Sequence, residues 1–284
     1  MKIEGIWVPL ITPFYNGELD RESYQKLIDH YIKLGVSGLI PLGTTGESPA
    51  ISETEFEKIL DWTVEMVGGR VPIFAGAGGN YTDKVVHMAK TVEKYPVSGI
   101  LSVSPYFNRP DQRGIYEHFL KISESTRLSI VMYNIPYRTG RNMENSTIRR
   151  LAELPNIVGL KDACGDIKQS MELLLDPPAD FSILTGEDIL FYSTLTLGGS
   201  GGILAAAHLD TERYIQLYHQ IKKNDYFSAL ENWKKLAGII PLLFLEPNPA
   251  PIKYRLWKKG LIRSAETRLP IVGITDELKE RLDR

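Results

Sequence analysis

The sequence predicts a (β/α)8 barrel, or TIM barrel, followed by a C-terminal helical extension. Short apolar runs typical of buried strands recur eight times in the first 205 residues. Helical patterns fill the intervals, and successive runs start roughly 20 to 35 residues apart, the length of a strand, a crossover helix and two loops. Short parallel strands with helical returns can close on themselves and leave no edge strand, which favours a barrel.

We expect a strand wherever an apolar run is bounded by turn residues. The eight ranges are 5–10, 38–41, 71–75, 99–103, 128–133, 157–161, 181–185 and 202–205. The capping-box residues Ser52 and Glu55 predict one helix start, Thr82 predicts the next, and Gly68 predicts a left-handed helix end. An open doubly wound sheet is the alternative fold, but it would favour a Gly-x-Gly-x-x-Gly turn after the first strand, and residues 12–17 supply none.

Further helical patterns follow the eighth strand, over 210–223, 226–244 and 251–259, with a short one from Thr275. They exceed the single helix that a bare barrel needs after its last strand. We therefore expect a barrel over residues 1–223, carrying the catalytic site, and a helical domain over 224–284. No Ser/Gly/Pro-rich linker marks a flexible boundary between them.

Composition and charge exclude several classes of protein. The 33 Lys and Arg residues nearly balance the 35 Asp and Glu residues, so nucleic acid is not an expected partner. No stretch approaches the roughly 20 apolar residues of a membrane span, and Glu4 and Pro9 interrupt the N-terminal apolar residues where a signal peptide would need them continuous. The single cysteine, Cys164, fits a reducing compartment, and we expect a cytoplasmic protein with small-molecule partners.

The residue that most needs explanation is Lys161, which ends the apolar run 157–161. Burial can lower the pKa of a lysine from about 10.4 by up to about 3 to 5 units, and a neutral amine is a Schiff-base nucleophile. Alternatively, the stem of Lys161 lies along the strand and its ammonium reaches water. Tyr133 ends the preceding strand, and neighbouring strands lie about 4.8 Å apart, so the two side chains can share a pocket.

Other strand ends carry polar residues that fit the same chemistry. The loop Gly43-Thr-Thr-Gly46 can hold a carboxylate through its backbone N–H groups and the hydroxyls of Thr44 and Thr45, or it is simply a tight turn. Arg138, on the loop after the fifth strand, can bind a second carboxylate or face solvent. Alternatively, Tyr133 is a buried aromatic with a satisfied hydroxyl, which is the commoner role of a tyrosine.

Metal-dependent chemistry is poorly supported. The five histidines stand singly, without the spacing of a metal site, so we expect no metal and no organic cofactor. They are His30, His87, His118, His208 and His219. Cys164 lies three residues after Lys161 and fits a packing residue better than a nucleophile.

Taken together, several motifs resemble the dihydrodipicolinate synthase and N-acetylneuraminate lyase family. They are Gly43-Thr-Thr-Gly-Glu-Ser48, Tyr133-Asn-Ile-Pro136, Arg138-Thr-Gly140, Gly159-Leu-Lys-Asp162 and Glu246-Pro-Asn-Pro249. The resemblance implies a class I aldolase acting on pyruvate without a cofactor. It implies that Lys161 forms the Schiff base, Tyr133 relays protons with Thr44, and the loop with Thr45 holds the pyruvate carboxylate. Backbone groups of Gly186 and Ile203 would line the lysine pocket.

Within the family, the Arg-Thr-Gly loop containing Arg138 resembles that of the synthases, which condense pyruvate with L-aspartate 4-semialdehyde in lysine and diaminopimelate biosynthesis. One alternative is an aldolase that releases pyruvate from a 2-keto-3-deoxy sugar acid or N-acetylneuraminate. Another is a catalytically silent ligand-binding paralogue. The resemblance also implies a homotetramer built from tight dimers, with Tyr106 and Phe107 near the interface beside the active site.

The chain departs from the synthase pattern at three places. Phe107 stands where the synthases usually have a proton-passing tyrosine, although Tyr106 is adjacent, and Tyr137 stands where serine is common. The positions of the lysine-inhibited members' effector pocket are also changed. Asn80 is retained there, while the other positions are Glu53, Phe56 and Lys84. We therefore expect inhibition by lysine to be weak or absent.

Overall fold

The structure, a computed structural model, describes residues 2–284. The chain divides into two compact units. The first unit contains the residues up to Gly5 together with Ile73–Ile203, and the second contains Ile6–Pro72 together with Leu204–Arg284.

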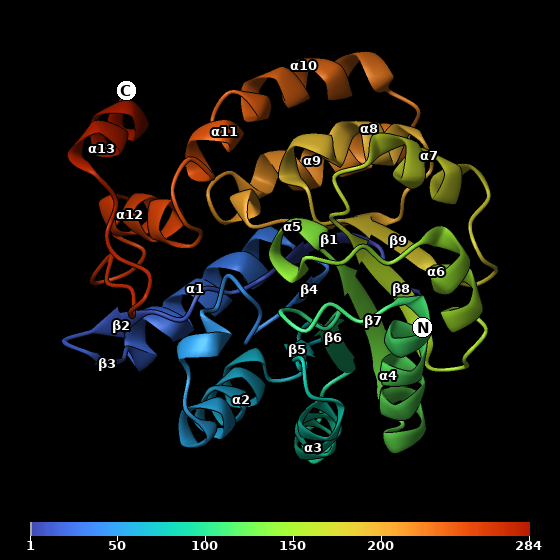
Figure 1. Cartoon of the computed structure of the whole chain (residues 1–284). Helices are drawn as coiled ribbons and strands as arrows, with labels where there is room; N and C mark the ends of the chain where they lie inside the picture. The colour runs from blue at the N-terminus through green and yellow to red at the C-terminus, as the bar shows by residue number, and fades with distance from the viewer. Residues whose placement is uncertain (1) are drawn as a thin grey trace. The chain divides into compact units, whose positions relative to one another are not determined.

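The first unit holds a run of parallel strands that pair in chain order. Their apolar residues are buried because the strands have no solvent-facing side, as expected for a parallel sheet. The returns between strands are helical (Figure 1). The strands are β5 (Phe74–Gly76), β6 (Gly99–Val103), β7 (Ser129–Asn134), β8 (Ile157–Asp162), β9 (Ser182–Thr185) and β10 (Gly201–Ile203). The helices are α3 (Thr82–Val92), α4 (Gln112–Ser125), α5 (Pro136–Thr139), α6 (Asn145–Leu151), α7 (Ile167–Leu175) and α8 (Phe191–Thr196).

The second unit contains β4 (Gly38–Leu39) and, from Ile6 onward, β1 (Gly5–Val8), and these two strands pair in parallel. It also contains a hairpin that the sequence analysis did not predict, formed by β2 (Phe14–Tyr15) and β3 (Glu18–Leu19). Asn16 and Gly17 form its turn, both with positive φ (53° and 83°). An Asn-Gly pair is a strong signal for such a turn, so this element was available in the sequence.

The remaining helices of the second unit begin and end close to the expected positions. Ser52 and Glu55 form the predicted capping box at the start of α2, and Gly68 ends that helix in the left-handed conformation. The longer helices are α1 (Arg21–Leu34), α2 (Glu53–Val67), α9 (Thr211–Lys222), α10 (Tyr226–Ala237), α12 (Ala250–Lys258) and α13 (Asp276–Asp283).

One predicted helix is wrong in its extent. The pattern over 226–244 is divided into α10, which ends at Ala237, and the short α11 (Ile240–Leu243). Gly238 lies at the break, and Pro241 follows at the beginning of α11. Proline has no N–H for the helical hydrogen bond and its ring clashes with the preceding turn, so a continuous helix through this point is disfavoured.

Eight parallel strands with helical returns make up the fold, and the predicted class, a (β/α)8 barrel with C-terminal helices, is confirmed. The boundary between residues 223 and 224 stays a prediction. Within residues 2–284, every helix falls short of the length and apolar character that a membrane-spanning segment requires.

Candidate active site

Lys161 and Tyr133 lie side by side at the carboxyl ends of two paired strands. The register of β7 and β8 places Tyr133 opposite Lys161, and the Lys161 Nζ is 4.2 Å from the centroid of the tyrosine ring. Both side chains are buried, with exposed fractions of 7% and 6%. The sequence prediction that these two residues meet is therefore confirmed in geometry, and the carboxyl end of a barrel is where TIM-barrel chemistry takes place.

The surroundings of Lys161 favour its neutral form. Burial lowers the pKa of the amine to about 8, because an ammonium loses its hydration there. The negative charges of Asp188 and Glu187 act in the opposite direction, and the positive charge of Arg138 adds to the lowering. With a pKa near 8, about one lysine in ten is neutral at pH 7, compared with roughly one in a few thousand for a free side chain.

The pKa of Tyr133 is shifted in the opposite direction, upward. Burial raises the pKa of its phenol well above the ordinary value, and the nearby Arg138 only partly offsets that. The phenol is therefore protonated at neutral pH and can donate a hydrogen bond or a proton to a group beside Lys161.

Gly186 provides the space that the Lys161 side chain occupies. It follows β9, and its N–H donates to the carbonyl of Asp162 (2.6 Å). A Cβ atom at position 186 would lie 2.7 Å from Cε and 2.9 Å from Cγ of Lys161. Any larger residue would push the lysine stem aside, so Gly186 is needed for the close approach.

The next residues on β7 and β8 point away from Lys161 and hold the adjoining loops. Asn134 Nδ2 donates to Met143 O (3.2 Å) and Asn134 Oδ1 accepts from Met143 N (3.0 Å), which fixes the loop that carries Arg138. Asp162 accepts from Cys164 N (3.1 Å) and from the Ser170 hydroxyl (2.5 Å). This alternation is the two-residue period of a strand.

Arg138 and the aromatic loop after β6 are exposed. The Arg138 guanidinium lies 5.0 Å from the centroid of the Tyr137 ring, and its charge affects the pKa values of both Lys161 and Tyr133. Tyr106 is partly exposed, and Phe107 is 89% exposed with a positive φ of 71°. Ile203, at the end of β10, is fully buried.

Thr44 and Thr45 belong to the second unit, on the loop between β4 and the 3-10 helix η1 (Ser48–Ala50). Consecutive turns close the loop, with Gly46 N donating to Gly43 O (3.1 Å) and Glu47 N donating to Thr44 O (3.0 Å). Thr44 is half-buried and Thr45 is buried.

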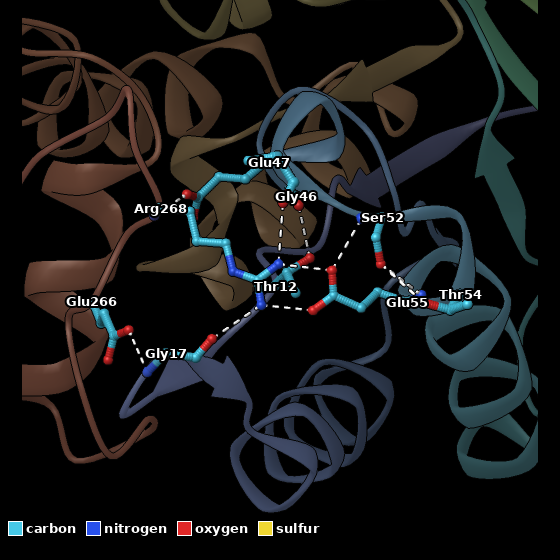
Figure 2. Close-up of polar contacts among 10 residues, drawn as sticks. Thr12, Gly17, Gly46, Glu47, Ser52, Thr54, Glu55, Glu266 and Arg268 are labelled. Atoms are coloured by element: carbon cyan, nitrogen blue, oxygen red, sulfur yellow. Dashed lines mark hydrogen bonds and ion pairs between the residues drawn. The ribbon is translucent and has the colours of Figure 1, made fainter.

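The sequence analysis missed a set of residues that hold this loop. Asn248 donates to Thr45 Oγ1, and Lys253 forms an ion pair with Glu47. Arg268 contacts Glu47 and Glu55 (Figure 2). The partners lie 203 residues apart for Asn248 and Thr45, and 221 apart for Arg268 and Glu47. No local pattern connects positions so distant in the sequence.

Comparisons with known proteins point in one direction. Residues 2–284 match the model of the dihydrodipicolinate synthetase family. The 4-hydroxy-tetrahydrodipicolinate synthase 2 of Clostridium acetobutylicum is 62% identical over 284 residues, which cover 100% of this chain and 99% of that protein.

Solved structures agree. A dihydrodipicolinate synthase from Thermotoga maritima is 39% identical with a TM-score of 0.96, covering 100% of this chain and 97% of that one. A chloride-inhibited dihydrodipicolinate synthase from Acinetobacter baumannii, solved in complex with pyruvate, is 32% identical with a TM-score of 0.96, covering 99% of this chain and 97% of that one.

Proposed function

The chain belongs to the dihydrodipicolinate synthetase family, and we propose from that premise that it condenses pyruvate with L-aspartate 4-semialdehyde to 4-hydroxy-tetrahydrodipicolinate. The observation that carries the proposal is the pairing of Lys161 with Tyr133. A buried amine with a lowered pKa, 4.2 Å from a tyrosine ring, is the arrangement that Schiff-base chemistry requires.

The first half of the reaction activates pyruvate. The neutral amine of Lys161 attacks the keto carbon, and the resulting carbinolamine loses water to give an iminium ion. The positive nitrogen withdraws electrons from the adjacent methyl group, which then loses a proton to form an enamine. Tyr133 is protonated at the start of the reaction and passes a proton to the carbinolamine hydroxyl, which leaves as water. Thr44 completes the proton relay.

The second half forms the carbon–carbon bond. The enamine carbon attacks the aldehyde carbon of the second substrate, the aldehyde oxygen takes a proton, and the imine to Lys161 is restored. The substrate's own amine then attacks the imine carbon, which closes the ring and releases Lys161. Pyruvate and the semialdehyde thus give the cyclic product and one water.

The other predicted residues have binding roles in this proposal. Thr45 and Thr44 hold the carboxylate of pyruvate, and Arg138 holds the carboxylate of the semialdehyde, for which a guanidinium offers two parallel donors. Backbone groups of Gly186 and Ile203 line the pocket of the lysine. Phe107 cannot pass a proton, so Tyr106 or water takes that part.

Assembly and location follow from the family resemblance. We place the enzyme in the cytoplasm as a homotetramer built from two dimers, with Tyr106 and Phe107 at the interface beside the active site. Its partners are small-molecule substrates.

The test of this function has two stages. Incubation with pyruvate and borohydride is expected to attach a reduced pyruvate adduct to the peptide containing Lys161, detected by mass spectrometry, and Lys161→Ala is expected to lack it. An unmodified Lys161 at saturating pyruvate would remove the mechanism.

The second stage identifies the reaction, because every pyruvate aldolase of the family would form that adduct. The product is expected to appear from pyruvate plus aspartate semialdehyde in wild type and to disappear in Lys161→Ala. Release of pyruvate from 2-keto-3-deoxy acids or N-acetylneuraminate, without condensation, would instead assign the enzyme to the aldolase branch.

A further inference from the structure

A buried cluster of charges holds the loop that carries Thr44 and Thr45. Lys253 Nζ lies 2.5 Å from Glu47 Oε1, and the side chains of these two residues are 0% and 1% exposed. The two groups are close enough for an ion pair, but the geometry at Glu47 Oε1 is not that of a hydrogen bond. Glu47 Oε2 accepts from the backbone N–H of Arg268 (2.9 Å). Both oxygens of this carboxylate are therefore fixed by residues near the C-terminus.

Arg268 ties the same loop to the following helix. Its guanidinium donates to both carboxylate oxygens of Glu55 (2.6 and 2.8 Å) and to the carbonyl of Ala50 (3.1 Å). A fourth bond reaches the carbonyl of Gly17 in the β2–β3 hairpin (3.1 Å). Figure 2 shows the guanidinium between Glu55 and the turn at Gly17.

Two further hydrogen bonds hold Thr45 and Gly46 of the same loop. The Thr12 hydroxyl donates to Gly46 O (2.7 Å), and Asn248 Nδ2 donates to Thr45 Oγ1 (3.0 Å). Because Thr45 accepts from Asn248, its own hydroxyl proton is available for an acceptor such as a carboxylate. Glu47 has a positive φ of 55°, which is uncommon for a residue with a side chain and is maintained by the surrounding contacts.

A buried ion pair is a poor choice for stability alone. Removing two charges from water is costly, and apolar residues of similar volume often stabilise a protein as well or better. Lys253 Nζ also donates to Glu266 O (2.8 Å) and lies 4.2 Å from the centroid of the Phe14 ring. What the ion pair adds is a fixed direction and distance for the Glu47 carboxylate, and so for the loop.

We propose that Lys253 and Arg268 are positioning residues that act through Glu47 and Glu55 to hold the loop Gly43–Ala50 in the shape that binds the pyruvate carboxylate. The inference rests on the proposed function, in which Thr44 and Thr45 bind that group. Helix α12, which carries Lys253, and the segment between α12 and α13, which carries Arg268, thereby contribute to affinity for the keto acid without taking part in the chemistry.

The test is the conservative variant Arg268→Lys, which keeps the charge and loses the forked set of donors. Arg263→Lys is its matched control, since Arg263 lies on the same segment and pairs with Glu22 and not with the loop. We expect the KM for pyruvate to rise about tenfold in Arg268→Lys, within the roughly 100-fold loss that a 1 Å misplacement can cause. The kcat is expected to fall as well, because Thr44, which completes the proton relay, lies on the same loop. The KM for the aldehyde is expected to stay within about twofold of wild type, as is every constant of Arg263→Lys.

The double variant Glu47→Gln/Lys253→Met examines the ion pair without leaving a buried charge unpaired. It is expected to fold, to raise the KM for pyruvate by a similar factor, and still to form the borohydride adduct on Lys161 at saturating pyruvate. A role in folding alone would lower kcat in proportion to the folded fraction and leave both KM values unchanged. If the double variant does not fold, Arg268→Lys decides.

The two proposals fail in different ways. If wild type forms no pyruvate adduct on Lys161, the proposed function falls, and this inference falls with it. If wild type forms the adduct and Arg268→Lys has an unchanged KM for pyruvate, the inference alone is overturned.

Discussion

Lys161 combines reactivity with an unfavourable contribution to stability. Its pKa is lowered from 10.5 to about 8 by burial, although Asp188 and Glu187 supply negative charge nearby. Such a lowering corresponds to roughly 3 kcal/mol of unfavourable free energy for the charged form in the folded protein. The same desolvation that makes the amine a nucleophile at neutral pH therefore weakens the fold.

Replacing this lysine is expected to stabilise the protein. In Lys161→Met, the free energy of unfolding at pH 7 should exceed that of wild type by about 1–3 kcal/mol, because an apolar side chain of similar length replaces a buried ammonium. Urea unfolding of both proteins, followed by circular dichroism, measures the difference. The variant is expected to lack activity.

The sign of the pH dependence follows from linkage. Between pH 8 and about 10.5 the unfolded chain holds the Lys161 proton and the folded chain has released it, so wild-type stability rises with pH in this window. The advantage of Lys161→Met should therefore be largest below pH 8 and shrink as pH approaches 10.5. A difference that is constant with pH, or a variant less stable than wild type at pH 7, would show that the amine is not desolvated.

At the scale of elements, strand positions were predictable because burial on both sides demands continuous apolar runs. The predicted range 99–103 coincides with β6, and β7 and β8 extend one residue past the predicted ends. The strand ends then placed Tyr133 and Lys161 together, since neighbouring parallel strands end at the same edge. The pairing of Tyr133 with Lys161 could therefore be predicted from the sequence.

The loops were less predictable. The hairpin at Asn16 and Gly17 had a local signal that was overlooked. No local signal predicted the contacts that Asn248, Lys253 and Arg268 make with the loop around Glu47. Each of these contacts joins residues that only the tertiary fold brings together. Periodicity describes a single element and contains no information about which distant charge an element meets.

The loop after β7 gives a prediction at this scale. Asn134 is fully buried and exchanges two hydrogen bonds with the backbone of Met143. Asn134→Ala would leave the Met143 N–H unpaired, while the Met143 carbonyl keeps its hydrogen bond from Gln169 Nε2 (2.8 Å). We expect it to destabilise the protein by roughly 1–3 kcal/mol. The loop also carries Arg138, so the KM for the semialdehyde is expected to rise severalfold while the KM for pyruvate stays unchanged. Steady-state kinetics with each substrate varied in turn measures the two KM values. An equal rise in the KM for pyruvate and the KM for the semialdehyde would contradict the role given to the loop.

At the scale of the whole molecule, we expect the proposed tetramer to assemble through exposed apolar surfaces, and two such surfaces lie on the first unit. One surface, here called the aromatic loop patch, consists of Tyr81, Tyr106, Phe107 and Tyr137. Hydrogen bonds from Asn108 to Asn80 and from Arg109 to Gly140 join the loops that carry it. These contacts restrain the backbone of the loops, which reduces the entropy that the loops would lose on association.

A second apolar surface lies on α7. Ile167, Met171 and Leu175 are four residues apart, so they share one face of the helix, and all three are exposed. A tetramer made of two dimers requires two different self-complementary interfaces. The aromatic loop patch and the α7 face supply two candidates.

Separate substitutions on the two surfaces test the proposed tetramer. Phe107→Glu should break one interface and Leu175→Glu the other, because each places a charge in a contact that excludes water. Each single variant is expected to sediment as a dimer, and the double variant as a monomer, in analytical ultracentrifugation. Phe227→Glu is the matched control, since Phe227 on α10 is 79% exposed and belongs to neither surface, so its tetramer should persist. A monomeric wild type, or a double variant that remains tetrameric, would show that these surfaces do not build the assembly.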